Sequence, residues 1–447
     1  MDYYTLKLFK LTYLNVDLEK SFVTHITDDK SILSIFLKSK MKACKICGCY
    51  NIKVRSTTKT KVNHSIYSDL KIELYIHRRK YFFSDCGHYF TEENPIVSSN
   101  RNISIMTDFR ILELLKDPTN TYSKVASFTS TSITYVQNVF DKYVNIKIGN
   151  LSTVICIDEV YAKRLTKHKY CCVLYAPQWK KIVDILPSRH KLNLIDYFAR
   201  IPISEKDKVE YISMDLWDSY KEMAQLCFPK AKVCADPFHI IKHLLECFRK
   251  IRIDVMKRFE HLKHEDHNFY WLYKKYFKFL ETDLSKLPDS MIKVSHSGMY
   301  LSKYQIIEYM LELDDKLALA YLLKEEYRNF NSKATIDNAC EWLDELILKF
   351  KQSCIKEYIP FWHILMDWHD EIINSFNRIN NHKITNGPME RVNRDIKNLF
   401  SISFGSTNFE RVRNRIMFCI NDNSPILGYR KKLTNKRTGK PRGKYNK

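Results

Sequence analysis

Four acidic residues that lie far apart in the sequence could share one chemical task. Asp158, Asp215 and Asp236 each follow an apolar run ("STVICI", "KVEYISM" and "AKVCA"), whereas Glu390 lies among Arg, Asn and Lys in "NGPMERVNRDIKNL". Carboxylates are preferred ligands of Mg²⁺, and a pair of such ions can polarise a phosphodiester. The alternatives are ordinary ones. An Asp after a strand often caps a turn or helix, and Glu390 could be a salt-bridge partner.

The elements around the aspartates predict how they are positioned. Apolar, β-branched runs predict strands, and amphipathic stretches predict helices, in the order β-β-β-α-β-α-β. This order fits a ribonuclease H-like α/β fold, in which the first strand is central and the fourth lies beside it, about 4.8 Å away. We therefore predict that Asp158 and Asp215 lie together and hold two Mg²⁺ ions. Asp236, one strand spacing further out, is the second choice for the middle acid.

The segment that contains Glu390 predicts a helix that returns the chain to this sheet. Gly387 turns the chain, and Pro388 fits the first helical position, where no N–H is needed. Glu390 then lies in the first turn, close to the sheet edge that presents the aspartates. Residues three, four and seven positions later share its side of the helix, and we predict that they bind phosphate: Asn393, Arg394 and Lys397.

Between the fifth strand and this helix the sequence is mostly helical. It predicts an all-α insertion at about 245–380, with long Lys and Arg side chains beside aromatic residues. Such an insertion could be a solvated amphipathic bundle or an arm that contacts DNA. The pattern alone leaves both open.

Cysteines near the N-terminus predict a zinc-ribbon-like module. Two knuckles are separated by "SIYSDLKIELYIHRRKYFF", residues 65–83, whose alternation of apolar and polar residues predicts a β-hairpin. Zinc takes four sulfur or nitrogen ligands in a tetrahedron. The predicted ligands are Cys44, Cys47, Cys86 and His88, with Cys49 as the alternative to His88. Without metal the module would be a degenerate ribbon held by its hairpin core.

Residues 105–147 predict a helix-turn-helix. Apolar positions predict one helix in "TDFRILELLK", a short one in "TYSKVASF" and a longer one whose N-terminus Ser132 can cap. In such units the last helix reads bases in the DNA groove. The polar residues near its start are the predicted DNA contacts: Ser132, Thr134, Tyr135 and Gln137. Plain packing of a three-helix bundle is the alternative.

The charge balance of the 447-residue chain points to a polyanionic partner. Lys and Arg number 73 against 51 Asp and Glu, a formal net charge of +22, which favours nucleic acid; a generally basic surface is the alternative.

No apolar run is long enough for a transmembrane helix, and the N-terminus lacks the features of a signal peptide. We expect a cytoplasmic, nucleoid-associated protein with reduced cysteines, and a basic tail that contacts phosphates or stays unbound.

Taken together, the chain resembles bacterial insertion-sequence transposases of the ISL-three type. The resemblance runs from about Cys44 to about Arg415 and rests on the knuckle, the helix-turn-helix, "VICIDE", "YISMDLWDSY", "FPKAKVCADPFH" and "NGPMERVNRDIKNLFSISFGSTNFERVRNRI". It implies a DDE catalytic domain with acids carried over, by position, onto Asp158, Asp215 and Glu390. The segment "DPFH" is similar in spacing to a Cys-x-x-His pair of related Mutator-like transposases.

The resemblance implies cut-and-paste transposition. The zinc module and helix-turn-helix would read the terminal inverted repeats, and two Mg²⁺ ions, or Mn²⁺, would serve DNA cleavage and strand transfer on double-stranded DNA. At least a homodimer is expected on DNA, with no membrane partner. A catalytically silent DNA-binding protein derived from a transposase is the alternative, and a nuclease that cuts without joining is a third. The predicted parts are 1–40 (N-terminal segment), 41–95 (zinc module), 105–147 (helix-turn-helix), 150–420 (catalytic domain) and 421–447 (tail).

Overall fold

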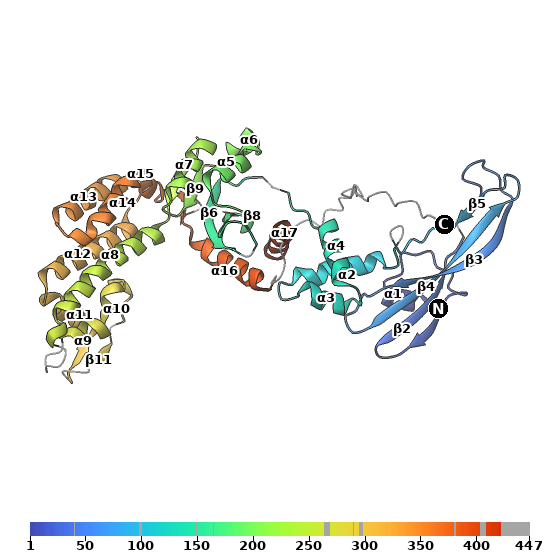
Figure 1. The fold of residues 1–447 in the computed structure, drawn as a ribbon, viewed down its shortest axis with the longest axis horizontal. Coiled ribbons are helices and arrows are strands. Elements are labelled where there is room, and N and C mark those ends of the chain that lie inside the picture. Colours follow the sequence, from blue (N-terminus) through green and yellow to red (C-terminus); the bar gives the residue numbers. More distant parts are fainter. Residues whose placement is uncertain are drawn as a thin grey trace, which may run out of the picture. The chain divides into compact units, whose positions relative to one another are not determined.

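The computed structural model describes ten stretches of the chain: residues 1–39, 41–97, 101–147, 150–163, 165–262, 269–288, 290–294, 298–379, 381–402 and 408–421. They form a mixed α/β protein of two compact units (Figure 1). The first unit holds residues 1–147 and the described residues from Leu399 on, and the second ends at Asn398. The predicted basic tail lies outside the described residues, apart from Asn421. No helix in the described stretches is long and apolar enough to cross a membrane.

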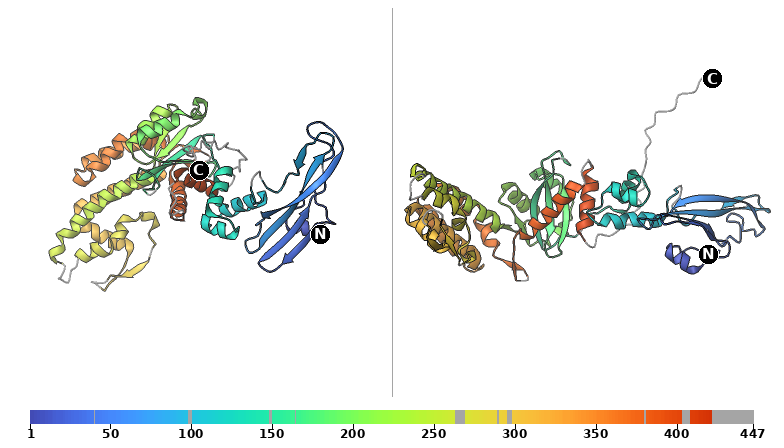
Figure 2. Two further views of the ribbon diagram at one scale, coloured as in Figure 1. Left: turned by 45° about the vertical axis from the view of Figure 1, so that its right-hand side comes forward. Right: turned by 90° about the horizontal axis from the view of Figure 1, so that it is seen from below.

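The first unit is built on a five-stranded sheet of order β1-β2-β4-β3, with β5 paired to β4. Its strands are β1 (Phe22–Ile26), β2 (Lys30–Phe36), β3 (Ile52–Asn63), β4 (Lys71–Phe83) and β5 (Tyr89–Thr91). Strand β2 runs parallel to β4, so the predicted N-terminal segment and the predicted zinc module share one sheet. The short helix α1 (Tyr3–Leu8) buries Leu6 against this sheet, shown in blue in Figure 2.

The predicted hairpin at residues 65–83 was wrong in its bounds. Only β4 lies in that segment, and its antiparallel partner is β3, which precedes it. Strand β3 has one buried residue, Val62, and most of its other side chains are exposed. As an edge strand it needs no apolar alternation, so "KVRSTTKTKVN" gave no strand pattern.

The predicted three helices are present in the first unit as α2 (Ile105–Lys116), α3 (Tyr122–Phe128) and α4 (Ile133–Tyr143). Each begins after a hydroxyl side chain that accepts a backbone N–H, and Ser132 caps α4 as expected. A fourth helix, α17 (Phe409–Ile420), joins their core through Phe418. The Arg415 side chain donates to the carbonyl of Asn120. The C-terminal helix that we had placed in the catalytic domain therefore packs with this group.

The second unit contains the predicted β-β-β-α-β-α-β order with one more short helix, α6, after α5, in a sheet of order β10-β9-β6-β7-β8. Its elements are β6 (Val154–Tyr161), β7 (Tyr170–Ala176), β8 (Lys181–Leu186), α5 (Lys191–Ala199), α6 (Ile203–Lys206), β9 (Tyr211–Met214), α7 (Asp218–Cys227) and β10 (Lys232–Ala235). Strands β6, β9 and β10 are mutually parallel, and β7 runs antiparallel to both of its neighbours, β6 and β8. On β6, Ile155 and Ile157 pack beneath α5 and α7.

A helical insertion follows β10, as predicted, and returns through a short hairpin to α16 (Gly387–Ile402). Its elements are α8 (Pro237–Arg258), η1 (Glu260–Leu262), α9 (Phe269–Lys275), α10 (Phe277–Glu281), η2 (Leu284–Lys286), β11 (Met291–Lys293), β12 (Tyr300–Ser302), α11 (Lys303–Glu312), α12 (Asp315–Lys333), α13 (Ala339–Gln352), η3 (Lys356–Tyr358), α14 (Ile359–Asp367), α15 (His369–Asn374), β13 (Arg378–Ile379) and β14 (His382–Lys383).

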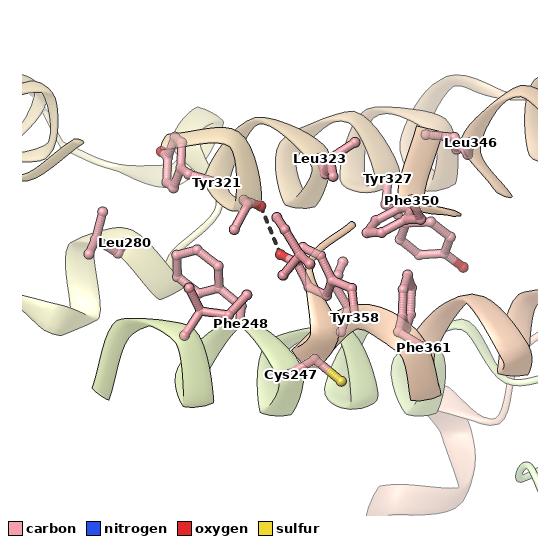
Figure 3. Close-up of a cluster of buried hydrophobic side chains, with 14 of the residues drawn as sticks. Cys247, Phe248, Leu280, Tyr321, Leu323, Tyr327, Leu346, Phe350, Tyr358 and Phe361 are labelled. Carbon is pink, nitrogen blue, oxygen red and sulfur yellow. Dashed lines mark hydrogen bonds between the residues drawn. The ribbon is translucent and has the colours of Figure 1, made fainter. Parts of the chain in front are cut away.

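Aromatic side chains from several helices form the core of this insertion. Phe350 packs against Tyr358 and Phe361, with 5.0 Å between ring centroids in each pair. The buried Tyr358 hydroxyl donates to the carbonyl of Ala320 over 2.7 Å, as Figure 3 shows. Because the buried hydroxyl is hydrogen-bonded, the bond offsets the cost of removing this polar atom from water.

Candidate active site

The three aspartates occupy equivalent positions on three neighbouring parallel strands. In the ladder, Ile157 of β6 pairs with Met214 of β9, and Met214 pairs with Ala235 of β10. The next residue along the chain is Asp158 within β6, Asp215 directly after β9 and Asp236 directly after β10. Since adjacent strands are about 4.8 Å apart, the sheet brings these carboxylates together at one edge.

A histidine that the sequence reasoning gave no role joins this edge. His239 lies in the first turn of α8, three residues after Asp236. Its Nε2 is 3.1 Å from Asp215 Oδ1 and 3.9 Å from Asp236 Oδ2. One donor atom from each of these three residues lies within 4.8 Å of the others, a spacing that a metal ion could bridge. The sequence signal was its place three residues after a strand-end acid.

Two asparagines attach α16 to the same edge. Asn386, just before the helix, donates its backbone N–H to Asp236 (3.2 Å) and its side-chain amide to the carbonyl of Ile157 (3.0 Å) and to Asp215 (3.4 Å). Two turns later, the Asn393 amide donates to Asp158 Oδ2 over 2.5 Å. The face of α16 that carries both asparagines therefore lies against the aspartates.

Glu390 lies between these two anchors. It follows Asn386 by four residues and precedes Asn393 by three, so all three share one side of the helix. Its side chain is exposed. Burial, chiefly, together with the charge of Glu390, raises the pKa of Asp236. Glu390 is thus close enough to act electrostatically on this edge of the sheet.

The carboxylates at this edge hold their protons more tightly than free ones do. Burial and then the charge of Asp215 raise the pKa of Asp158 to about 7, although the Glu159 and Asn393 N–H groups oppose the rise. Burial and the charge of Asp236 raise the pKa of Asp215 to about 6. Crowded acids of this kind favour either a shared proton or a bound cation.

An arginine that the sequence reasoning also missed stands beside this group. The Arg189 guanidinium, in the loop between β8 and α5, pairs with the carboxylate of Glu159. It also lies 4.4 Å from the ring centroid of Tyr170 and 4.5 Å from that of Trp217. The two aromatic rings hold the plane of the guanidinium. The N–H groups at its edge can therefore bind anions, such as the carboxylate of Glu159.

The predicted DNA contacts divide into two groups. Arg394 and Lys397 are exposed on α16, and Ser132 and Thr134 are exposed at the start of α4, with Gln137 half-buried. The side chains of the other two predicted contacts, Asn393 and Tyr135, make hydrogen bonds within the protein. Asn393 is only 8% exposed and binds Asp158, and the Tyr135 hydroxyl donates to Asp108 over 2.6 Å.

Four thiols, rather than three thiols and an imidazole, come together near the tip of the first unit's sheet. One sulfur from each of Cys44, Cys47, Cys49 and Cys86 lies within 4.8 Å of the others. Adjacent sulfurs are 3.3 to 3.6 Å apart, close to the roughly 3.8 Å that tetrahedral Zn–S bonds would give. His88, the predicted fourth ligand, is exposed and is not part of this group.

Turns at two glycines shape this thiol group. Gly48 and Gly87 have φ angles of 77° and 70°, which a residue with a Cβ rarely adopts. Their N–H groups bond back to the carbonyls of Cys44 and Phe83. Hydrogen bonds from the Cys49 backbone and from neighbouring thiols lower the pKa of Cys47 to about 7, which favours the thiolate that a metal needs.

A mixed α/β unit that gathers carboxylates at the ends of parallel strands offers the oxygen ligands that a divalent metal ion prefers. Residues 155–416, more than half of the chain, match a family model described as transposase, of the ISL-three type. The chain belongs to this transposase family. It is also similar to the transposase for insertion sequence element IS1001 of Bordetella parapertussis, with 22% identity over 235 residues. The alignment covers 51% of this chain and 57% of that protein, so the chain spans little more than half of its relative's length.

Proposed function

We propose that this protein is a DDE transposase that binds the terminal inverted repeats of an insertion sequence and cleaves and joins DNA. The observation that carries the proposal is the attachment of α16 to the strand ends through Asn386 and Asn393. It brings the turn that contains Glu390 to the aspartates from more than 150 residues away in the sequence. A salt-bridge role for Glu390 would not require this docking.

Asp158, Asp215 and Glu390 are the proposed catalytic acids. Asp215 is preferred to Asp236 as the middle acid because its side chain is 21% exposed, against 5% for Asp236. Both carboxylates accept a hydrogen bond from Asn386, so the difference in exposure decides between them. A ligand must remain open to its ion, which favours Asp215. We accordingly place Asp236 and His239 beside the acids as partners of Asp215.

The donor set fits divalent metal ions. Closely spaced carboxylates whose pKa values are raised by burial and by each other's charge gain when a dication replaces their shared protons. Asp158, Asp215 and Glu390 would hold two Mg²⁺ ions, or Mn²⁺. Such ions would activate the attacking water or 3′-hydroxyl and stabilise the leaving oxygen. The chain's own cations, Arg394 and Lys397, would bind neighbouring phosphates.

The strand order of the second unit supports a ribonuclease H-like assignment for it, with the helices α8 to α15 as its insertion. In the first unit, α2 to α4 are proposed as the helix-turn-helix and the four thiols as a zinc site. Ser132, Thr134 and Gln137 would contact bases, whereas Tyr135 would hold α4 in place. Double-stranded DNA is the proposed partner, bound by at least a dimer.

A strand-transfer assay with pre-cut transposon ends tests the catalytic proposal. The variants Asp158→Asn, Asp215→Asn and Glu390→Gln should each lose joining by at least about a thousandfold while binding the ends normally. Glu326→Gln, which removes a half-buried carboxylate paired with Lys349 on the insertion, is the matched control. Normal joining by Glu390→Gln would refute the assignment. Specific end binding by the wild type without any cleavage or joining would favour the silent DNA-binding protein.

Metal analysis of the purified chain tests the zinc proposal. Cys49→Ser should lose one bound zinc per chain, because the sulfur of Cys49 lies between those of Cys47 and Cys86. His88→Ala should retain it. Zinc loss in His88→Ala, with retention in Cys49→Ser, would restore the ligand set that the sequence suggested.

A further inference from the structure

A second group of metal-type donors lies on the helical insertion, away from both sites above. Cys340 and Asp344 are four residues apart on α13, so they lie on one face of that helix. His369 is the first residue of α15. One donor atom from each of these three residues lies within 4.8 Å of the others. We propose that Cys340, Asp344 and His369 form a binding site for a single zinc ion.

The distances suit zinc. His369 Nε2 is 3.1 Å from Asp344 Oδ1, and two ligands about 2.0 Å from a tetrahedral ion would be about 3.3 Å apart. Cys340 Sγ is 3.9 Å from the other oxygen of Asp344, Oδ2, against about 3.5 Å for a sulfur and an oxygen on one ion. Shifts of a few tenths of an ångström, within the reach of exposed side chains, would complete three bonds. Water would supply the fourth.

The surroundings of His369 orient it for such a role. Its Nδ1 lies 3.1 Å from Asp370 Oδ1. An ionised carboxylate can only accept a hydrogen bond, so with zinc bound on the Nε2 side, Nδ1 would keep its hydrogen for Asp370 and Nε2 would give its lone pair to the ion. A carboxylate behind the second nitrogen is the usual support of a metal-binding histidine. That lone pair points to the side where Asp344 and Cys340 lie.

An ordinary ion pair explains less. A charged His369 could pair with Asp344 and Asp370, but the Asp344 side chain is 60% exposed, and exposed ion pairs contribute little. The pair also gives no reason for a thiol on the same side. A zinc ion uses all three donors, and its thiolate and imidazole ligands select it over Mg²⁺. Exposure gives the ion and its water a route of entry.

Such an ion would connect the insertion to the catalytic sheet. Helix α15 packs on β10, and the Asn374 side chain donates to the carbonyl of Val233 over 3.0 Å. The strand then leads directly to Asp236. Zinc between α13 and α15 would therefore hold the insertion against the strand that carries one of the site's acids. The inference does not depend on the proposed catalytic function.

Alkylation of the full-length protein tests the site residue by residue. Chelator-treated protein is exposed to a maleimide with and without zinc chloride, and peptide mass spectrometry follows each cysteine. Metal-bound thiolate is a poor nucleophile for alkylation, so zinc should slow labelling of Cys340 by at least about tenfold. Cys354, also exposed on the insertion and outside the donor group, should label equally fast in both conditions.

Variants separate this site from the four-thiol group. His369→Ala and Asp344→Asn should each abolish zinc protection of Cys340, whereas Cys47→Ser should preserve it. Equal labelling of wild-type Cys340 with and without zinc would overturn the proposal and leave an ion pair. Protection that persists in both His369→Ala and Asp344→Asn would overturn it too, because other donors would then hold the ion. The comparison within wild-type protein needs no variant to fold.

Discussion

Acid should destabilise the first unit through one buried histidine. His64 is fully buried at the end of β3, where Nδ1 is 2.8 Å from the Ser104 hydroxyl and Nε2 is 2.8 Å from the Phe9 carbonyl. The carbonyl can only accept, so Nε2 carries the hydrogen and Nδ1 accepts from Ser104. Because Ser104 also caps α2, the neutral imidazole joins three parts of the unit.

The size of the effect follows from the pKa of His64. Burial, opposed in part by the hydrogen bond to Phe9, lowers this pKa from 6.5 to about 4. His64 therefore takes up a proton below pH 6.5 in the unfolded chain, but only near pH 4 in the folded chain. Stability is unaffected above pH 6.5 and falls as pH decreases through this window. Each unit of pKa shift corresponds to about 1.4 kcal/mol, so the free energy of unfolding should fall by about 3 kcal/mol by pH 4.

Thermal unfolding of the first unit between pH 7 and 4 measures this loss. For a unit of this size the expected fall in Tm is roughly 10 °C. His64→Gln is the control, because its amide can still donate to Phe9 but does not titrate. It should be less stable at pH 7 by about 1 kcal/mol and depend less on pH. The same pH dependence in both proteins would refute the buried neutral imidazole.

Three other substitutions test the second unit. Asn393→Ala removes the amide that donates to Asp158. A hydrogen bond to a charged group contributes about 1.5–3 kcal/mol, so the rate of strand transfer should fall about 10- to 150-fold. An unchanged rate of joining would show that this bond is dispensable. Arg189→Met should lower joining about tenfold by leaving Glu159 unpaired beside the acids, and adding Glu159→Gln should restore part of it if charge is the cause. Lys324 is fully buried, and burial lowers its pKa to about 8. Between pH 8 and 10.5 the unfolded chain loses the lysine proton that the folded chain has already lost, so wild-type protein should gain about 3 kcal/mol of stability relative to Lys324→Met. Chemical unfolding at each pH measures this gain.

The sheet of the second unit could be predicted because its strands are buried. Runs such as "VICI" and "CCVLYA" contain almost only apolar residues, since helices or other segments cover both faces of the sheet. Their order then placed β6 beside β9, and so Asp158 beside Asp215. Strand β3 could not be found in this way. It pairs with β4 through backbone hydrogen bonds and through exposed side chains such as Lys61, which pairs with Glu73, and neither leaves an apolar alternation in the sequence.

The site residues on patterned strands could likewise be predicted, whereas those on helices and turns could not. Acids that follow apolar runs were visible, because the strand that positions each of them has its own pattern. The bonds of Asn393 and His239 to the aspartates were not predicted, because a polar residue on an amphipathic helix looks the same whether it faces water or a carboxylate. Cys49 and His88 are similar: spacing allows either to complete a tetrahedron, and only the turns at the two glycines bring the sulfur inward.

The choice of asparagine to attach α16 has a physical logic. A lysine at position 393 would neutralise Asp158 and compete with any cation there, whereas an aspartate would add repulsion to a carboxyl whose pKa is already about 7. An amide donates to the carboxylate without changing the net charge. It also leaves a neutral oxygen: Oδ1 of Asn386 and Oδ1 of Asn393 are both buried with no hydrogen-bond partner in the described part of the chain. Buried acceptors without partners are costly, and beside crowded carboxylates a water or a cation would satisfy them. The same two side chains that hold the helix thus leave their oxygens suited to what the acids bind.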